Sequence, residues 1–217
     1  MGRVLFDDRV GAGRKLAEAL REFRGKDVVV LGIPRGGVVV ANEVAKGLKA
    51  PLDVVITRKI EAPGEPEYAL GAVTQEGEVI MDRQAAESLG ASRQYLDAQV
   101  RQKREEVKER VRRFRGDAPY PRLEGKVVII VDDGIATGSS VGAAVITVRK
   151  MSPKEVVVAV PVAPADAVET MSDDGIKVVC LETPAEFLAI GEFYSKFDQV
   201  EDGEVKRILD ESWAEST

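Results

Sequence analysis

The sequence predicts an α/β fold in which helices cover both faces of a mainly parallel, doubly wound sheet. Short apolar runs alternate with helical patterns along the chain, as expected when strands and crossover helices follow one another. The run Val127–Val131 consists of five β-branched residues. A strand without a polar side is buried on both faces, which is typical of a parallel sheet.

Length and composition limit the possible functions. The 217 residues fit one domain, 1–217. The net charge of −6 gives no reason to expect a nucleic-acid partner. One cysteine and no histidine exclude an internal disulfide, imidazole metal sites and Ser-His or Cys-His catalysis. Neither a membrane-length apolar run nor a signal-peptide pattern is visible, so we expect a cytoplasmic protein without a membrane partner.

The first half of the chain contains one strong helical pattern and one cluster of helix breakers. Leu16, Leu20 and Phe23 share one face of an amphipathic pattern. Pro63 and Gly64 indicate an irregular segment. In order, we expect a helix at 11–24, a strand at 28–33, a helix at 38–48, a strand at 52–57, a long loop at 58–71 and short strands at 72–74 and 78–81.

Residues 92–115 form a single long helical pattern with one apolar stripe and nine basic against four acidic residues. We expect them to dominate a helical insertion at 82–118. Three interpretations remain open: a solvated helix packed by one face, a subunit contact in a homodimer, or a nucleic-acid-binding arm. After it, we expect strands at 127–131, 155–160 and 178–181, helices at 141–150 and 165–172, and a closing helix from about 203.

The end of the strand Val127–Val131 has the most informative pattern. Asp132 and Asp133 follow it directly, and the Gly/Thr/Ser segment 134–140 then leads into a helix. A helix N-terminus presents free N–H groups and a positive dipole, so it can hold an anion. Two carboxylates beside such a site suit a ligand that also offers hydroxyls or a divalent cation. The alternative is a structural corner with an incidental acidic pair.

Residues 128–140 resemble the 5-phosphoribosyl-1-pyrophosphate (PRPP) motif of type I phosphoribosyltransferases, in which an apolar strand precedes two acidic residues and a Thr-Gly turn. The resemblance implies that Asp132 and Asp133 bind the ribose hydroxyls. It implies that the loop binds the 5′-phosphate through Gly134, Ile135, Ala136, Thr137, Gly138, Ser139 and Ser140. It also implies Mg²⁺ bound mainly through PRPP, with no dedicated protein ligands.

The resemblance also implies roles for two further segments. The run 32–37 alone fits a structural turn equally well; beside the motif it resembles the family's pyrophosphate loop, with Arg35, Gly36 and Gly37 binding diphosphate. Arg58 and Lys59 open the segment where the family places its closing loop, and are our candidates for catalytic cations. Loop-tip contacts are expected from Glu65, Glu67 and Tyr68.

The acceptor half of the site is less defined. Enzymes for 6-oxopurines carry Asp before Thr-Gly, whereas this chain has Ala136, which disfavours those bases. We expect a hood from 182–217 and the N-terminal segment. Its aromatic cluster either stacks a base or forms core: Phe187, Phe193, Tyr194 and Phe197.

The whole layout resembles an uncharacterised bacterial group of predicted phosphoribosyltransferases. It implies transfer of phosphoribose from PRPP to an unidentified nitrogenous acceptor with release of diphosphate. The alternative is a PRPP-sensing regulator that uses the basic helix 92–115 on nucleic acid. A PRPP synthetase-like enzyme is disfavoured because nothing resembles an ATP-binding element.

Overall fold

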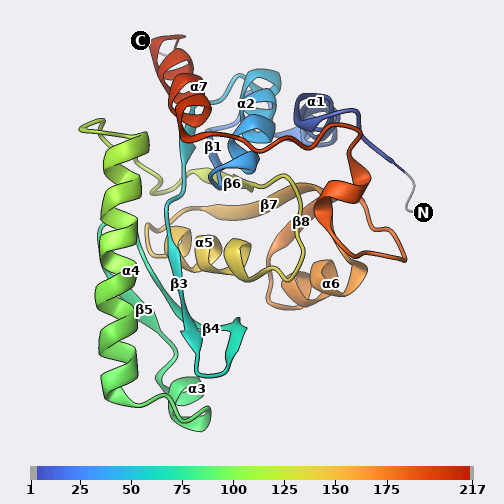
Figure 1. Cartoon of the computed structure of the whole chain (residues 1–217). Coiled ribbons are helices and arrows are strands. Elements are labelled where there is room, and N and C mark those ends of the chain that lie inside the picture. Colours follow the sequence, from blue (N-terminus) through green and yellow to red (C-terminus); the bar gives the residue numbers. More distant parts are fainter. Residues whose placement is uncertain (1–3, 216–217) are drawn as a thin grey trace.

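Figure 1 shows the computed structural model of the chain, which describes residues 4–215. The outermost residues of the expected domain 1–217 and of the expected hood range 182–217 therefore lie outside the described part. Within 4–215, no helix combines the length and apolar character needed to cross a membrane.

A five-stranded parallel sheet forms the centre of the molecule. Its strand order is β2-β1-β6-β7-β8, and each neighbouring pair runs parallel. The strands are β1 (Val28–Gly32), β2 (Leu52–Val54), β6 (Val127–Val131), β7 (Glu155–Val162) and β8 (Lys177–Glu182). The predicted fold class is confirmed.

Helices cover both faces of this sheet, as Figure 1 shows. One face carries α1 (Arg9–Ala19), α2 (Gly36–Leu48) and α7 (Asp202–Glu215), and the other carries α5 (Ser139–Arg149) and α6 (Ala165–Asp173). Alternate strand residues supply the two cores: Val30 and Ile129 pack in the first, and Leu31 and Ile130 in the second. This alternation explains why the strand sequences contain no polar side.

A second, antiparallel sheet corrects the expectation of a long loop at 58–71. Its strands are β3 (Arg58–Ala62), β4 (Glu65–Val73) and β5 (Val79–Met81), in the order β3-β4-β5. Ala62 pairs with Glu65, so Pro63 and Gly64 form only the hairpin turn. The helix-breaking residues Pro63 and Gly64 mark the tip of the hairpin, while Ile60 of β3 and Leu70 of β4 are fully buried.

The expected insertion 82–118 contains α3 (Arg83–Ser88) and α4 (Arg93–Phe114). Ser92 caps α4 by accepting a hydrogen bond from the Tyr95 backbone N–H at 3.2 Å. Val107 and Phe114 are buried in the same core cluster as β1 and α2. The long helix therefore packs by one face onto the body of the protein, in agreement with the first of the three interpretations.

The N-terminal segment joins the segment that follows β8. Phe6 and Tyr194 form an isolated parallel bridge, and their rings lie 5.4 Å apart. This part of the chain also holds the short 3-10 helix η2 (Ile190–Phe193), and another, η1 (Arg21–Phe23), follows α1. The two segments grouped in the expected hood are thus in contact, although their role as a hood stays a prediction.

Candidate active site

The site lies where the direction of winding of the sheet changes. β1 and β6 are neighbours and end together, with Gly32 paired to Val131. The chain then turns through α2 towards β2 on one side and through α5 towards β7 on the other. Loops that diverge in this way leave a crevice at the carboxyl ends of the strands, the usual ligand position in open α/β sheets.

Two glycines bring the loops after β1 and β6 into direct contact. A Cβ atom on Gly36 would lie 2.0 Å from Oδ2 of Asp133, and one on Gly37 would lie 2.7 Å from Oδ1 of Asp132. At position 37 a larger side chain would also meet the backbone of Val131 and Asp132 at 2.8 Å, and at position 36 it would displace the paired side chains of Asp133 and Arg9. The two segments that the sequence singled out separately, 32–37 and 132–140, form one site.

Asp133 is fixed by groups from both ends of the chain. The Arg9 Nε donates to its carboxylate at 2.7 Å, and the Tyr194 hydroxyl donates to its backbone carbonyl at 2.6 Å. The Arg9 guanidinium also lies 3.8 Å from the centre of the Phe197 ring. Sequence reasoning missed Arg9, because an arginine at the start of a surface helix carries no signal of a partner 124 positions away.

Asp132 has a different environment from its neighbour. One of its oxygens accepts the Asp133 backbone N–H at 2.9 Å. Burial, together with the adjacent Asp133 carboxylate, raises the pKa of Asp132 well above its ordinary value. Burial and the Asp133 charge also raise the pKa of the Tyr194 phenol, which keeps it a hydrogen-bond donor. The acidic pair thus combines a poorly solvated carboxyl with a charge-paired one.

The loop 134–140 presents donors at the start of α5. Gly138 occupies the left-handed region with φ of +78°, and among the described residues no side chain caps the helix that follows it. Its first N–H groups therefore stay available for an anion. The hydroxyls of Thr137 and Ser139 lie 3.1 Å apart beside them.

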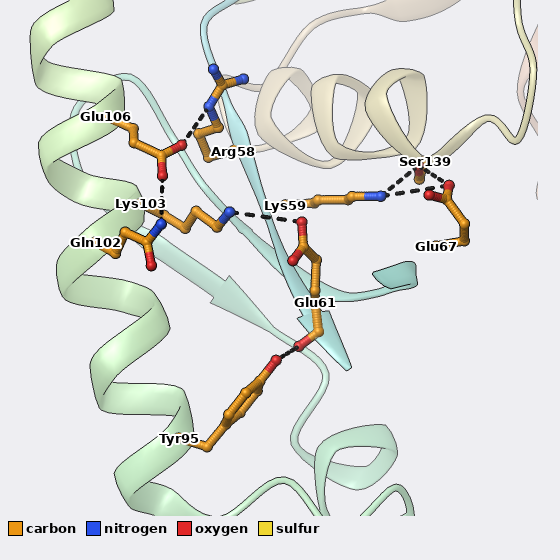
Figure 2. A network of polar contacts seen from close by, with 9 residues as sticks. All are labelled: Arg58, Lys59, Glu61, Glu67, Tyr95, Gln102, Lys103, Glu106 and Ser139. Carbon is orange, nitrogen blue, oxygen red and sulfur yellow. Dashed lines mark hydrogen bonds and ion pairs between the residues drawn. The ribbon is translucent and has the colours of Figure 1, made fainter. Parts of the chain in front are cut away.

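The hairpin β3–β4 reaches this loop through Lys59 and Glu67 (Figure 2). Lys59 Nζ lies 3.1 Å from the Ser139 hydroxyl and 3.6 Å from the Glu67 carboxylate. Glu67 accepts from Thr137 at 2.7 Å and from Ser139 at 3.3 Å. The Thr137 hydrogen bond and the Lys59 charge lower the pKa of Glu67. The hydroxyls of the loop therefore donate their hydrogen bonds to the Glu67 carboxylate.

The remaining expected cations lie on the other side of the crevice. Arg58 pairs with Glu106 of α4 at 2.9 Å, and Arg35 lies 3.8 Å from Asp202 of α7. Arg58 and Lys59 line a cavity of about 260 Å³ together with Pro34. Within the described residues, Arg35 forms no hydrogen bond or ion pair with Asp132 or Asp133.

Gly134, Ile135 and Ala136 connect the acidic pair to the hydroxyl loop. Ile135 is buried, and its backbone N–H donates to the Val162 carbonyl. Gly134 lies under Ile190, whose Cγ2 would be 2.7 Å from an added Cβ. The segment around η2 therefore covers the start of this loop. Ser140, in the first turn of α5, lines the 260 Å³ cavity on the other side.

This arrangement defines an α/β protein with an uncapped helix N-terminus, an acidic pair and a cation-lined cavity near one switch point. The model of the phosphoribosyl transferase domain matches residues 9–197, and the chain belongs to this family. A sequence relative from Mycobacterium tuberculosis H37Rv, "Putative phosphoribosyl transferase Rv0571c", is 45% identical over 206 residues, covering 95% of this chain and 46% of the relative. The counterpart from strain CDC 1551, MT0597, matches with the same identity and coverage.

The chain spans about half the length of these curated relatives. Among solved structures, that of TT1426 from Thermus thermophilus superimposes with a TM-score of 0.88 at 45% identity, covering 95% of this chain and 98% of that one. The family that residues 128–140 resemble is thus confirmed as the family of this chain.

Proposed function

We propose that the chain transfers the 5-phosphoribosyl group of PRPP to a nitrogenous acceptor and releases diphosphate. The observation that carries this proposal is the contact of Gly36 and Gly37 with Asp133 and Asp132. It places two glycine-rich loops and two carboxylates around one crevice. Such a crevice suits a ligand with a phosphate at one end, hydroxyls in the middle and a second anionic group.

Each part of the site has a proposed role. The N–H groups at the start of α5 and the hydroxyls of Thr137 and Ser139 hold the 5′-phosphate. Asp132 and Asp133 accept hydrogen bonds from the ribose hydroxyls, and the Arg9 ion pair orients the Asp133 side chain. The loop 34–37 and Arg58 face the diphosphate, and Lys59 joins them once its ammonium leaves Ser139 and Glu67.

The proposed reaction needs no protein nucleophile. The bond between ribose C1 and the diphosphate oxygen breaks, and its electron pair leaves with diphosphate. The lone pair of the acceptor nitrogen forms the new bond to C1, and a proton leaves that nitrogen. Positive charge that develops on the ribose is stabilised by the carboxylates of Asp132 and Asp133, and negative charge on the diphosphate by Arg58 and Lys59.

The donor set fits a hard divalent cation, which the family implies. Carboxylate oxygens are ligands that Mg²⁺ accepts. One oxygen of Asp132 receives the Asp133 N–H, and no cationic side chain among the described residues forms an ion pair with Asp132. We propose that PRPP supplies most ligands and that Asp132 adds a direct or water-mediated contact. When bound, Mg²⁺ would neutralise charge on the leaving diphosphate.

The acceptor is proposed to enter from the side of 184–197. A cleft of about 1000 Å³ extends from Thr137 and Ser139 to Phe187. Phe193 and Tyr194 are buried and pack against Phe187 and Phe197 at ring distances of 5.0 Å. This supports the core interpretation for the two buried rings, while the partly exposed Phe187 stays available to a flat base.

A diphosphate-release assay tests the function. The protein is incubated with PRPP, Mg²⁺ and a panel of purine bases, pyrimidine bases and amines. We expect release with one acceptor class and none with 6-oxopurines, because Ala136 replaces the Asp of enzymes that use them. Absence of PRPP binding by calorimetry would overturn the proposal.

We further propose a cytoplasmic location and a homodimer. Cell fractionation tests the location, and light scattering tests the oligomeric state.

The second candidate function, a PRPP-dependent nucleic-acid regulator, rests on the exposed face of α4. Arg101, Arg104, Lys108 and Arg112 are all exposed there, and basic stripes bind phosphate backbones. Replacing these four residues with Gln should abolish nucleic-acid binding if the regulator exists. PRPP turnover in the same variant should be unchanged, because none of the four lines the crevice.

A further inference from the structure

The cavity beside the loop 34–37 has one wall that belongs to the long helix. This 260 Å³ cavity is bounded by Pro34, by Arg58 and Lys59 at the start of β3, by Ser140 of α5 and by Lys103, Glu106 and Arg110 of α4. Residues 103, 106 and 110 follow the spacing that places side chains on one helix face. The α4 helix therefore forms one wall of a cavity that also reaches Pro34, in the loop after β1, and Ser140, in the first turn of α5.

Most charges around this cavity are already balanced. Arg58 pairs with Glu106 at 2.9 Å, and Lys103 lies 3.7 Å from Glu61 (Figure 2). Arg110 differs from them, because it makes no hydrogen bond or ion pair with any residue that the structure describes. Arg110 is half-buried, and its guanidinium N–H groups have no hydrogen-bond partner among the described residues.

Arg110 also lies among other cations. Burial, followed by the charge of Arg58 and more weakly that of Arg35, lowers the pKa of Arg110, and the carboxylates of Asp202 and Glu106 only partly offset this effect. A half-buried cation beside like charges destabilises the free protein. An anion in the cavity would reverse that effect, since it would attract all of these cations at once.

We propose that Arg110 binds the diphosphate group of the donor, so that the long helix completes the leaving-group side of the site. This inference rests on the proposed function and adds a residue to it. The planar guanidinium offers paired N–H donors that match two oxygens of a phosphate group, and a lysine cannot reproduce this geometry. The cavity volume of about 260 Å³ is large enough for a diphosphate group.

The test compares Arg110→Gln and Arg110→Lys with Arg101→Gln, an exposed residue on the opposite face of α4. Isothermal titration calorimetry measures the affinity of each variant for three ligands: inorganic diphosphate with Mg²⁺, PRPP, and ribose 5-phosphate. Ribose 5-phosphate serves as the comparison because it lacks the diphosphate group. We expect Arg110→Gln to weaken diphosphate and PRPP binding about 10- to 100-fold. Arg110→Lys should restore part of the loss. Ribose 5-phosphate should bind within about twofold of wild type in every variant, as should all three ligands in Arg101→Gln.

Thermal unfolding separates this role from a structural one. Since Arg110 has no partner to lose among the described residues, Arg110→Gln should unfold at or above the wild-type temperature. Equal losses for diphosphate and ribose 5-phosphate, or unchanged diphosphate affinity, would overturn the role of Arg110. In the second case PRPP turnover would persist and the proposed function would stand. Wild-type protein that binds none of the three ligands would overturn both. If Arg110→Gln does not fold, Arg110→Lys alone carries the comparison.

Discussion

Asp132 and Asp133 are adjacent in sequence and yet lie in different electrostatic environments. Asp133 has a cationic partner in Arg9 at 2.7 Å, whereas Asp132 receives a backbone N–H. The chain keeps two carboxylates close together although burial and the Asp133 charge disfavour ionisation of Asp132 by raising its pKa, and such local cost is typical of functional sites. This asymmetry leads to a prediction for each residue.

Asp132→Asn should weaken PRPP binding about tenfold while stabilising the free protein at neutral pH. The folded state raises the pKa of Asp132, so above its ordinary value the folded protein binds more protons than the unfolded chain. Stability contributed by this group is therefore present at low pH and lost as pH rises. The asparagine still accepts the Asp133 N–H. Unfolding of wild type and variant between about pH 4 and 8 measures the difference; a stability gap that shrinks as pH rises would contradict the prediction.

Arg9→Ala should destabilise the protein by about 2–3 kcal/mol, because it leaves the Asp133 carboxylate without its charged partner. It should also weaken PRPP binding, since the freed carboxylate is no longer oriented. Arg14→Ala is the matched control: Arg14 lies on the same helix and pairs with Glu43, but its side chain is 72% exposed, so we expect a loss below about 0.5 kcal/mol. Urea unfolding measures the free energy of unfolding of both variants. A similar loss of this free energy in Arg9→Ala and Arg14→Ala would argue against the role of Arg9.

At the level of elements, the hairpin β3–β4 differs most from the sequence prediction. Pro63 and Gly64 indicate a break, and a two-residue turn between strands gives the same local signal as a long loop. The pairing partners of β3 lie in β4, and Ile60 belongs to the same buried cluster as Val30 of β1 and Val107 of α4. By contrast, β1, β6 and α4 were predicted well, because a strand buried on two faces leaves a continuous apolar run and a long helix packed by one face leaves a periodic apolar stripe.

The hairpin tip gives a third prediction, for Glu67→Gln. Glu67 occupies the hydroxyls of Thr137 and Ser139, which we assign to the 5′-phosphate. A phosphate must displace this carboxylate, so removing its charge should tighten ribose 5-phosphate binding about two- to fivefold, a modest gain because the side chain is exposed. Glu65→Gln, at the same exposed tip, should change affinity by less than about 1.5-fold. Weaker binding in Glu67→Gln, measured by calorimetry, would mean that Glu67 supports the ligand.

At the scale of the whole molecule, the contact between α4 and the five-stranded sheet determines whether the chain unfolds in one step. Arg115, directly after α4, donates to both Asp53 oxygens at 2.9 and 3.0 Å. Both residues are buried, and burial raises the pKa of Asp53. The indole of Trp213 donates to the Leu52 carbonyl at 3.1 Å, and its ring centre lies 5.9 Å from the Arg115 guanidinium. Neither partner of the ion pair could be recognised from sequence, because they lie 62 positions apart.

Arg115→Met should therefore destabilise the whole protein by about 3–5 kcal/mol, because it leaves Asp53 buried without its partner. Trp213 is the only tryptophan, so its fluorescence reports on α7 and β2, while circular dichroism reports on all helices. If α4 and the sheet share one core, the two signals should change at the same urea concentration in wild type and in the variant. Arg112→Met, at an exposed position of α4, should leave the midpoint unchanged. A helical signal that is lost before the fluorescence change would show that α4 unfolds separately, and the proposed diphosphate site would then open without loss of the central sheet.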